Sequence, residues 1–485
     1  MLNHYFTHSE IKQILADVTG KTLGQVDKKN VFHRTLTNKK ITGIAGDVIE
    51  QSVLGYPANN SQNPDLIVDN TDTELKTTGL RRNKKNRNAL EAKEPMSITA
   101  VSPERIINEV FVTSSFWHKV ANLLIVYYLY ESDTTVTASD YADFVIQGFQ
   151  FVDFSTEDKQ ILENDWLLVQ NFIKKAQLSQ SPYEEYKKLS SSLRKDLMFI
   201  DTAPKWPNRP RFRLKRSFVS YIAQRKFDKS FNPLVSHLKS YAEIDGMLHS
   251  LSVKYKGHTI KDIAKDLNIN IDSRKKLNKN IGEQILVRMF KGTGKVLKNI
   301  DLFSKLELVP KTVVQTANHK GTEDTKFGKV NFDDWLDSTK SFEQSEVYDY
   351  FTNQSILFMI FIKEAKNTPL EDAVFQGFKR SVFDENFIQN DVKSVWERVR
   401  QLVNDKKLID VVSLDKDGVP VLNSNNIVKS APNWPKSKDF TLFFRGTSVD
   451  STWKPLTING IQMYTQYFWV KRNAIQELLD KENFI

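Results

Sequence analysis

The chain has 485 residues, too many for one ordinary hydrophobic core, so two or more domains are expected. With 40% hydrophobic and 26% charged residues it has the composition of a soluble globular protein, and its net charge of +10 permits a polyanionic partner without identifying one. The sequence contains no cysteine, which excludes disulfides, thiolate metal sites and a cysteine nucleophile, and this fits a cytoplasmic location. The N-terminus lacks the pattern of a signal peptide.

Two helical segments open the chain. Residues 8–18, "HSEIKQILADV", carry apolar residues at helical spacing. Residues 43–56, "GIAGDVIEQSVLGY", are also helix-like and carry Glu50. We therefore expect a carboxylate on a helix just before the next segment.

That segment, residues 63–78, reads "NPDLIVDNTDTELKTT" and predicts two short strands joined by a polar turn. Side chains two apart on a strand point to the same side, so Glu74 and Lys76 face one way and Leu75 faces the core. If Asp65 lies at the end of the preceding strand or turn, its carboxylate can approach Glu74, and two converging carboxylates repel unless a cation lies between them. Mg²⁺ is commonly held by one or two carboxylates, and a nearby lysine can orient water or stabilise a phosphoryl group.

The pattern Asp-x₈-Glu-x-Lys is weak by itself, because a solvated hairpin with an ion pair would give it too. A basic run follows at residues 79–93, "GLRRNKKNRNALEAK", which is either a solvated loop or a loop that contacts phosphate. The next apolar runs, residues 121–130 and 355–361, are well short of the roughly 20 residues that span a bilayer, so no membrane is expected. Residues 157–177 predict an amphipathic helix.

Segments of the two halves echo each other in the same order, which favours a duplicated domain over chance similarity of amphipathic segments. The boundary is expected at the polar stretch 239–259, giving domains 1–238 and 239–485. The matched pairs are 11–17 with 260–266, 38–51 with 278–290, 113–130 with 350–365, 163–178 with 392–408, and 211–222 with 466–478.

Six segments of the first half resemble, in order, the MutH family of a mismatch-repair nicking endonuclease and the two-domain type II restriction endonucleases of the Sau-type group that cut at GATC. They are "TGKTLGQV" (19–26), "GDVIE" (46–50), "PDL" with "ELKTT" (64–78), "TSSFWHK" (113–119), "ENDW" (163–166) and "FRLKRSFVSYI" (212–222). The resemblance implies a mixed α/β restriction-endonuclease core of the PD-(D/E)xK type, present twice.

The resemblance also implies the roles of the site residues. Glu50, Asp65, Glu74 and Lys76 would be catalytic, with Asp65 and Glu74 binding Mg²⁺. Lys119 matches a family lysine near the DNA. If residues 215–216 and 471–472 lie on strands, each pair places at most one side chain outward. The basic residues expected to contact DNA are Arg81, Arg82, Lys84, Lys85, Lys119, Lys215, Arg216, Arg445 and Lys471. The stretch 199–212 aligns poorly with the family, so the base-reading residues stay open.

In the second half, Leu286 falls where Glu50 stands and Val309 falls two residues before Lys311. Asp301 and Lys311 are the only parts of the pattern that could survive there. The metal site is therefore expected to be lost, leaving a half that binds DNA without cutting it.

The leading hypothesis is a Mg²⁺-dependent type II restriction endonuclease acting on double-stranded DNA. It implies a cognate DNA methyltransferase as a functional partner. The chain would be a monomer that can pair with a second copy on DNA. Its second half would bind another recognition site and promote cleavage. The alternatives are a strand-nicking repair endonuclease and a non-cleaving DNA-binding regulator. Duplication argues against the first, and an intact carboxylate cluster, which would repel phosphate, argues against the second.

Overall fold

The structure, a computed structural model, describes residues 4–38, 41, 43–56, 64–82, 90–132, 136–203, 208–228, 238–270, 277, 280–292, 301–306, 308–318, 321, 323–338, 340–423, 425–448, 450 and 452–485. The chain divides into two units, residues 1–246 with 291–308, and residues 247–290 with 309–485. The division falls within helix α11 (Tyr241–Tyr255), close to the expected boundary between residues 238 and 239. In the described part of the chain, no helix is long and apolar enough to cross a membrane.

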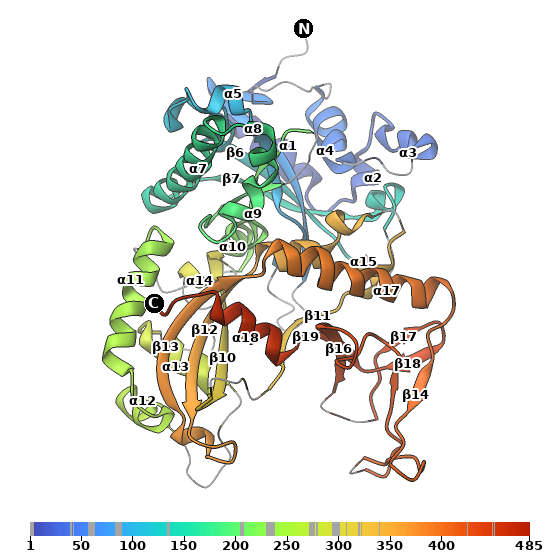
Figure 1. Cartoon of the computed structure of the whole chain (residues 1–485). Helices are drawn as coiled ribbons and strands as arrows, with labels where there is room; N and C mark the ends of the chain where they lie inside the picture. The colour runs from blue at the N-terminus through green and yellow to red at the C-terminus, as the bar shows by residue number, and fades with distance from the viewer. Residues whose placement is uncertain are drawn as a thin grey trace. The chain divides into compact units, whose positions relative to one another are not determined.

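The first unit is built on a mixed sheet in the order β1-β2-β3-β6-β7, with β4 pairing on β3 (Figure 1). Its β2–β3 and β6–β7 pairs are antiparallel, whereas β1–β2 and β3–β6 are parallel. A second sheet has the order β5-β9-β8. The strands are β1 (Tyr5–Phe6), β2 (Leu66–Val68), β3 (Thr71–Arg82), β4 (Leu90–Ala92), β5 (Met96–Ala100), β6 (Leu123–Leu129), β7 (Val145–Val152), β8 (Ile200–Ala203) and β9 (Arg211–Leu214).

Strand β6 explains the first apolar run of the sequence. All seven of its residues are buried, as expected for a strand that has neighbours on both edges and is covered on both faces. Helix α7 (Thr156–Gln177) confirms the predicted amphipathic helix, and the Ser155 hydroxyl caps it by accepting from the Asp158 N–H. The other helices of this unit are α1 (His8–Val18), α2 (Leu23–Val26), η1 (Val31–His33), α3 (Arg34–Thr37), α4 (Ile44–Val48), η2 (Ile49–Leu54), α5 (Pro103–Ile106), η3 (Phe111–Thr113), α6 (Ser115–Val120), η4 (Ser139–Asp143), α8 (Pro182–Lys187), α9 (Leu189–Leu193), α10 (Arg216–Phe227) and α14 (Asp301–Leu306).

The second unit contains two three-stranded sheets, β10-β12-β13 and β11-β19-β16, and two hairpins, β14-β15 and β17-β18 (Figure 1). Its strands are β10 (Leu308–Thr316), β11 (Thr325–Lys329), β12 (Ser355–Lys363), β13 (Val374–Val382), β14 (Asp410–Val412), β15 (Ser430–Pro432), β16 (Leu442–Thr447), β17 (Leu456–Ile458), β18 (Ile461–Met463) and β19 (Thr465–Val470). Its helices are α12 (Ile260–Asp266), α13 (Ile281–Met289), α15 (Phe332–Leu336), η6 (Phe342–Gln344), α16 (Glu346–Asn353), η7 (Leu370–Asp372), η8 (Phe387–Val392), α17 (Lys393–Asn404) and α18 (Arg472–Asp480).

The two units repeat one order of elements. Sheets β3-β6-β7 and β10-β12-β13 correspond, as do β5-β9-β8 and β11-β19-β16. Strands β6 and β12 each follow a short helix that begins at a serine cap, Ser114 or Ser345. The mixed α/β fold predicted from the sequence is therefore seen in both units.

One of the predicted sequence echoes was wrong. Thr22 bridges to Val145 and Thr259 bridges to Val374, which places α12 at the position of α2 and not of α1. The counterpart of α1 is α11, which precedes α12 along the chain. Residues 11–17 and 260–266 look alike because both are amphipathic helices, and a match of a few residues cannot distinguish one such helix from another.

Candidate active site

The β2–β3 hairpin forms as predicted. Its turn consists of Asp69 and Asn70, both with positive φ, 44° and 64°. Two-residue hairpin loops of type I′ need positive φ at both central positions, and Asp and Asn tolerate it better than most residues. Leu66 pairs with Thr73 across the hairpin, and one further step along the ladder brings the residue before β2 opposite Glu74.

That residue is Asp65. Its Oδ2 accepts a hydrogen bond from the Leu75 N–H at 3.2 Å, so the carboxylate lies against β3 beside Glu74. The backbone is held from the other side, because His4 Nδ1 lies 3.0 Å from the Asp65 carbonyl oxygen and β1 pairs with β2. Burial and the charge of Glu74 raise the pKa of Asp65.

Glu74 is fully buried and meets two ammonium groups. Lys76 Nζ lies 2.5 Å from its Oε1, and Lys119 Nζ lies 3.0 Å and 2.9 Å from Oε1 and Oε2. Lys119 comes from α6 and is itself buried. A buried carboxylate is tolerated only when it is paired and hydrogen-bonded, and the two lysines supply that pairing.

Glu50 lies on a stretch of altered helix. Helix α4 follows its N-cap residue Gly43 and continues as the π-helical segment η2, whose C-cap residue Gly55 has a φ of 81°. Such π-helical turns occur often at functional sites, because the extra residue changes where the side chains point. Burial first, then the charges of Asp65 and Asp47, raise the pKa of Glu50 to about 7.

These side chains suit a hard divalent cation. Among the described residues, no group of three or more His, Cys, Asp or Glu is arranged to hold a metal ion. Mg²⁺, however, usually takes only one or two carboxylates and keeps several waters, and Asp65 and Glu74 provide two. Burial first, and neighbouring carboxylates after it, raise the pKa values of Asp65 and Glu50, and a cation bound between them would favour their charged forms.

Two comparisons with known proteins bear on this arrangement. A family model described as the DNA mismatch repair enzyme MutH matches residues 54–165. The type II restriction enzyme Sau3AI of Staphylococcus aureus is 22% identical over 525 residues, covering 99% of this chain and 99% of that enzyme. Residues 54–165 are thus similar to MutH, and the first unit, which contains them, is called the MutH domain below.

The segment matched as MutH contains most of the site, namely Asp65, Glu74, Lys76 and Lys119, and begins just after Glu50. The structure brings all five of these residues toward one end of the β2–β3 hairpin. Sequence reasoning placed Lys119 near the DNA but missed its direct pairing with Glu74. It also missed His4 and Tyr56, whose side chains border the site. His4 carries no signal, because its partner lies 61 residues away.

The residues of the first unit that were predicted to contact DNA lie in different surroundings. Arg81 lies 4.9 Å above the Tyr130 ring, and Arg82 pairs with Glu131 at 2.5 Å. Lys84 and Lys85 lie outside the described residues. None of these positions is tested as a DNA contact by the structure.

Lys215 and Arg216 do not lie on a strand as assumed, because β9 ends at Leu214 and Lys215 caps α10. Lys215 is 4% exposed and donates to the Leu197 carbonyl at 2.5 Å. This burial contradicts a direct phosphate contact in the conformation described. Arg216 begins α10 and is half-buried.

The second unit differs from the MutH domain at the same positions. A Cβ at Gly46 would come 3.5 Å from Thr77 Oγ1, and one at Gly282 would come 1.8 Å from Thr312 Oγ1, so each glycine faces the corresponding threonine of its own unit. This register matches Lys311 to Lys76 and puts Val309 in place of Glu74.

Lys311 has lost its carboxylate partner in that register. Its Nζ donates to the Lys326 carbonyl at 2.5 Å, and burial lowers its pKa to about 8. Asp301 begins helix α14, which belongs to the first unit, and so does not form a hairpin in the second. The described residues of the second unit therefore contain no counterpart of the acidic pair.

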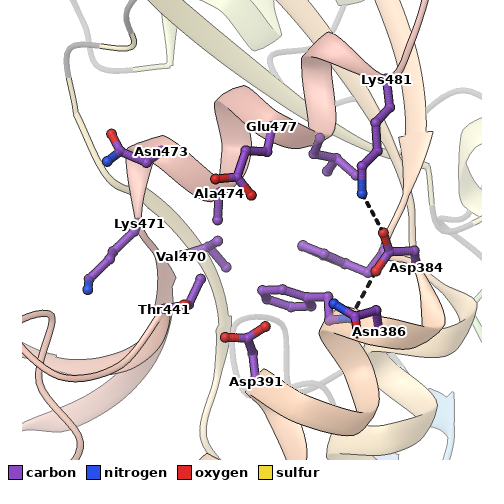
Figure 2. A pocket seen from close by; sticks show the side chains of 13 residues that line it. Asp384, Asn386, Asp391, Thr441, Val470, Lys471, Asn473, Ala474, Glu477 and Lys481 are labelled. Carbon is purple, nitrogen blue, oxygen red and sulfur yellow. Dashed lines mark hydrogen bonds and ion pairs between the residues drawn. The ribbon is translucent and has the colours of Figure 1, made fainter.

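The second unit has a cavity of about 190 Å³ at the start of α18 (Figure 2). Its lining carries charges of both signs, and Asp384 pairs there with Lys481 at 2.7 Å. Lys471 lines this cavity and caps α18, and Arg445 pairs with Asp324 at 2.7 Å. The cavity differs in composition from the carboxylate–lysine site of the MutH domain.

Proposed function

We propose that this chain is a sequence-specific endonuclease for double-stranded DNA, of the type II restriction class, that uses Mg²⁺ in its first unit. The observation that supports it is the convergence of Glu50, Asp65, Glu74 and two lysines in the MutH domain. The resemblance to a restriction enzyme along the whole chain supports the restriction class over other nucleases.

In this proposal Asp65 and Glu74 would hold the divalent ion, which when bound would polarise phosphate and lower the pKa of a bound water. The ammonium of Lys76, which is partly exposed, would be suited to orient the attacking water or to stabilise charge on the phosphate. Lys119, which is buried, stays to balance the charge of Glu74.

Each chain carries one such carboxylate set among its described residues, so one chain cuts one strand at a time. Cutting both strands then needs two chains on one site or two successive nicks. We therefore propose a monomer that pairs on DNA. A GATC site, with a cognate methyltransferase that protects it, follows from the resemblance.

The second unit is proposed to be a DNA-binding effector. Loss of its acidic residues removes charges that repel phosphate, and Arg445 and Lys471 remain as candidate contacts. A strand-nicking repair activity is the second candidate, favoured by the description of the matched family as a mismatch repair enzyme. A non-cleaving regulator would leave the buried carboxylates of the MutH domain without a role.

The test is digestion of methylated and unmethylated plasmid with Mg²⁺, followed by sequencing of the ends. Staggered or blunt double-strand ends at one short sequence would support the restriction class, and nicked circles alone would support the repair nickase. Asp65→Asn serves as the matched control, with binding to the same duplex measured by fluorescence anisotropy. If the wild-type protein binds DNA but neither cuts nor nicks it with Mg²⁺ or Mn²⁺, the endonuclease proposal is refuted.

A further inference from the structure

Tyr56 is a buried side chain beside the acidic site that the proposed reaction does not yet use. It follows η2, and its N–H donates to the Glu50 carbonyl at 3.0 Å, which ties it to the turn that carries Glu50. Its ring is 2% exposed and lies against the His4 ring, with centroids 4.7 Å apart. His4 in turn contacts the Asp65 backbone, so Tyr56 lies between the two carboxylate-bearing segments.

The hydroxyl of Tyr56 has no hydrogen-bond partner in the described structure. Leaving a buried hydroxyl unpaired costs stability, and phenylalanine would fill the same space without that cost. A buried polar group that stays unpaired in a native structure calls for an explanation, and beside a reactive centre a functional role is one of them.

The charged groups that act on this hydroxyl are carboxylates. The pKa of Tyr56 is raised far above its usual value. The largest cause is burial, followed by the charges of Glu50, Asp65 and Glu74 in that order. The phenol therefore stays protonated, and what it offers the site is a neutral donor. Glu50 exerts the largest of the three charge effects, in keeping with its shared turn.

We propose that Tyr56 is a positioning residue, whose hydroxyl donates a hydrogen bond to the Glu50 carboxylate when the divalent ion and DNA are bound. The inference rests on the proposed endonuclease function and deepens it. A neutral donor fixes the orientation of Glu50 without competing with the cation for its charge, as a lysine would. Outer partners of this kind typically change metal affinity or activity by about 10- to 100-fold.

The test is Tyr56→Phe in the full-length protein. Divalent-ion affinity is measured by calorimetric titration of Ca²⁺ into the complex with a specific duplex, and strand cleavage with Mg²⁺ is measured under single turnover. We expect the variant to bind Ca²⁺ about 10-fold more weakly and to cleave about 10-fold more slowly, with an unchanged or raised Tm in EDTA. Tyr127→Phe is the matched control, since Tyr127 is also fully buried but its hydroxyl bonds to Gln150 away from the site.

A double-mutant cycle separates positioning from packing. In a Glu50→Gln background, Tyr56→Phe should lose most of its effect on Ca²⁺ affinity, because its partner is no longer a carboxylate. Equal Ca²⁺ affinity and rate for Tyr56→Phe and wild type, with a raised Tm, would overturn the inference and leave the nuclease proposal intact. Absence of Ca²⁺ binding and of cleavage in the wild type would instead refute the function on which the inference rests.

Discussion

The crowding of carboxylates makes a quantitative prediction for Glu50→Gln in the metal-free protein. The pKa of Glu50 rises from 4.5 to about 7 on folding. The folded protein thus binds the proton of the Glu50 carboxyl more tightly than the unfolded chain does. The contribution of Glu50 to the free energy of unfolding is therefore most favourable below about pH 4.5 and falls as the pH rises toward 7. At 1.36 kcal/mol per pKa unit the full penalty is about 3 kcal/mol, and because the side chain is only half-buried, solvent screening reduces it to about 2 kcal/mol.

Glu50→Gln removes the charge and keeps the shape. Near pH 8 in EDTA we expect its free energy of unfolding to exceed that of the wild type by about 2 kcal/mol, a Tm increase of about 4–8 °C for a unit of this size. Near pH 4 the two proteins should differ little. Scanning calorimetry across this pH range measures both values.

Glu10→Gln is the control of opposite sign. Glu10 is exposed, and hydrogen bonds from Thr7 lower its pKa, so the stability it contributes is present at high pH and is lost as the pH falls. Its replacement should therefore give no gain near pH 8. If Glu50→Gln and wild type follow the same stability curve from pH 4 to 8, Glu50 is not an uncompensated buried charge, and the description of the site as a crowded acidic cluster fails.

Three further predictions concern cleavage. Asp65→Asn and Glu74→Gln should reduce the single-turnover rate by at least about 10³-fold while specific DNA binding persists, and Lys76→Arg should not restore the activity lost in Lys76→Ala, because a planar guanidinium does not replace a compact ammonium. Normal cleavage by Asp65→Asn would show that the site is misassigned. Lys311→Ala should leave the single-turnover rate within about 3-fold of wild type, and a larger loss at unchanged DNA affinity would make the second unit catalytic. Plasmids with two sites should be cut faster than plasmids with one, and a specific duplex added in trans should speed cleavage of the one-site plasmid, because a second binding surface raises the effective concentration of sites. Equal rates at fixed salt would refute the effector role.

Local patterns in the sequence predicted the elements of the fold well. The alternation in residues 66–78 with an Asp-Asn turn specified the β2–β3 hairpin, whereas the unbroken apolar run of β6 fitted a buried strand or a buried helix face and the structure shows the strand. The correspondence of helices between the halves could not be read from short matches. This correspondence depends on which helix packs beside β7 or β13. The bridges from Thr22 to Val145 and from Thr259 to Val374 show it, and they are visible only in the folded structure.

The site was predictable in part for the same reason. Asp65, Glu74 and Lys76 lie within twelve residues, so strand periodicity puts Glu74 and Lys76 on one side, and a hairpin turn of the right length brings Asp65 opposite Glu74. Lys119 reaches Glu74 because β6 lies parallel to β3 and α6 ends just before β6, a consequence of tertiary topology. Lys215 was predicted as a candidate DNA contact, but its ammonium is buried. It donates a hydrogen bond to the Leu197 carbonyl and interacts electrostatically with the buried carboxylate of Asp165.

Asp165 and Lys215 also bear on the different roles proposed for the two units. In the first unit, Asp165 is fully buried and accepts hydrogen bonds from the Met198, Phe199 and Ile200 N–H groups, and the charge of Lys215 favours its ionised form. This fixes the loop before β8. In the second unit Trp396 occupies the place of Trp166, which puts Val395 where Asp165 stands, so the residue at the position of Asp165 is no longer a carboxylate that could favour an inward Lys471.

An ammonium without that inward partner is better solvated at the surface, where it can meet phosphate. The same substitution pattern removes the acidic pair, with Val309 at the position of Glu74 and Leu286 at that of Glu50. Both changes replace buried charge by apolar packing, which a duplicated unit tolerates because the sheets and helix order stay the same. A unit so altered lacks the carboxylates that would hold the cation in the first unit, in keeping with the proposed role of the second unit as an effector that binds DNA without cutting it.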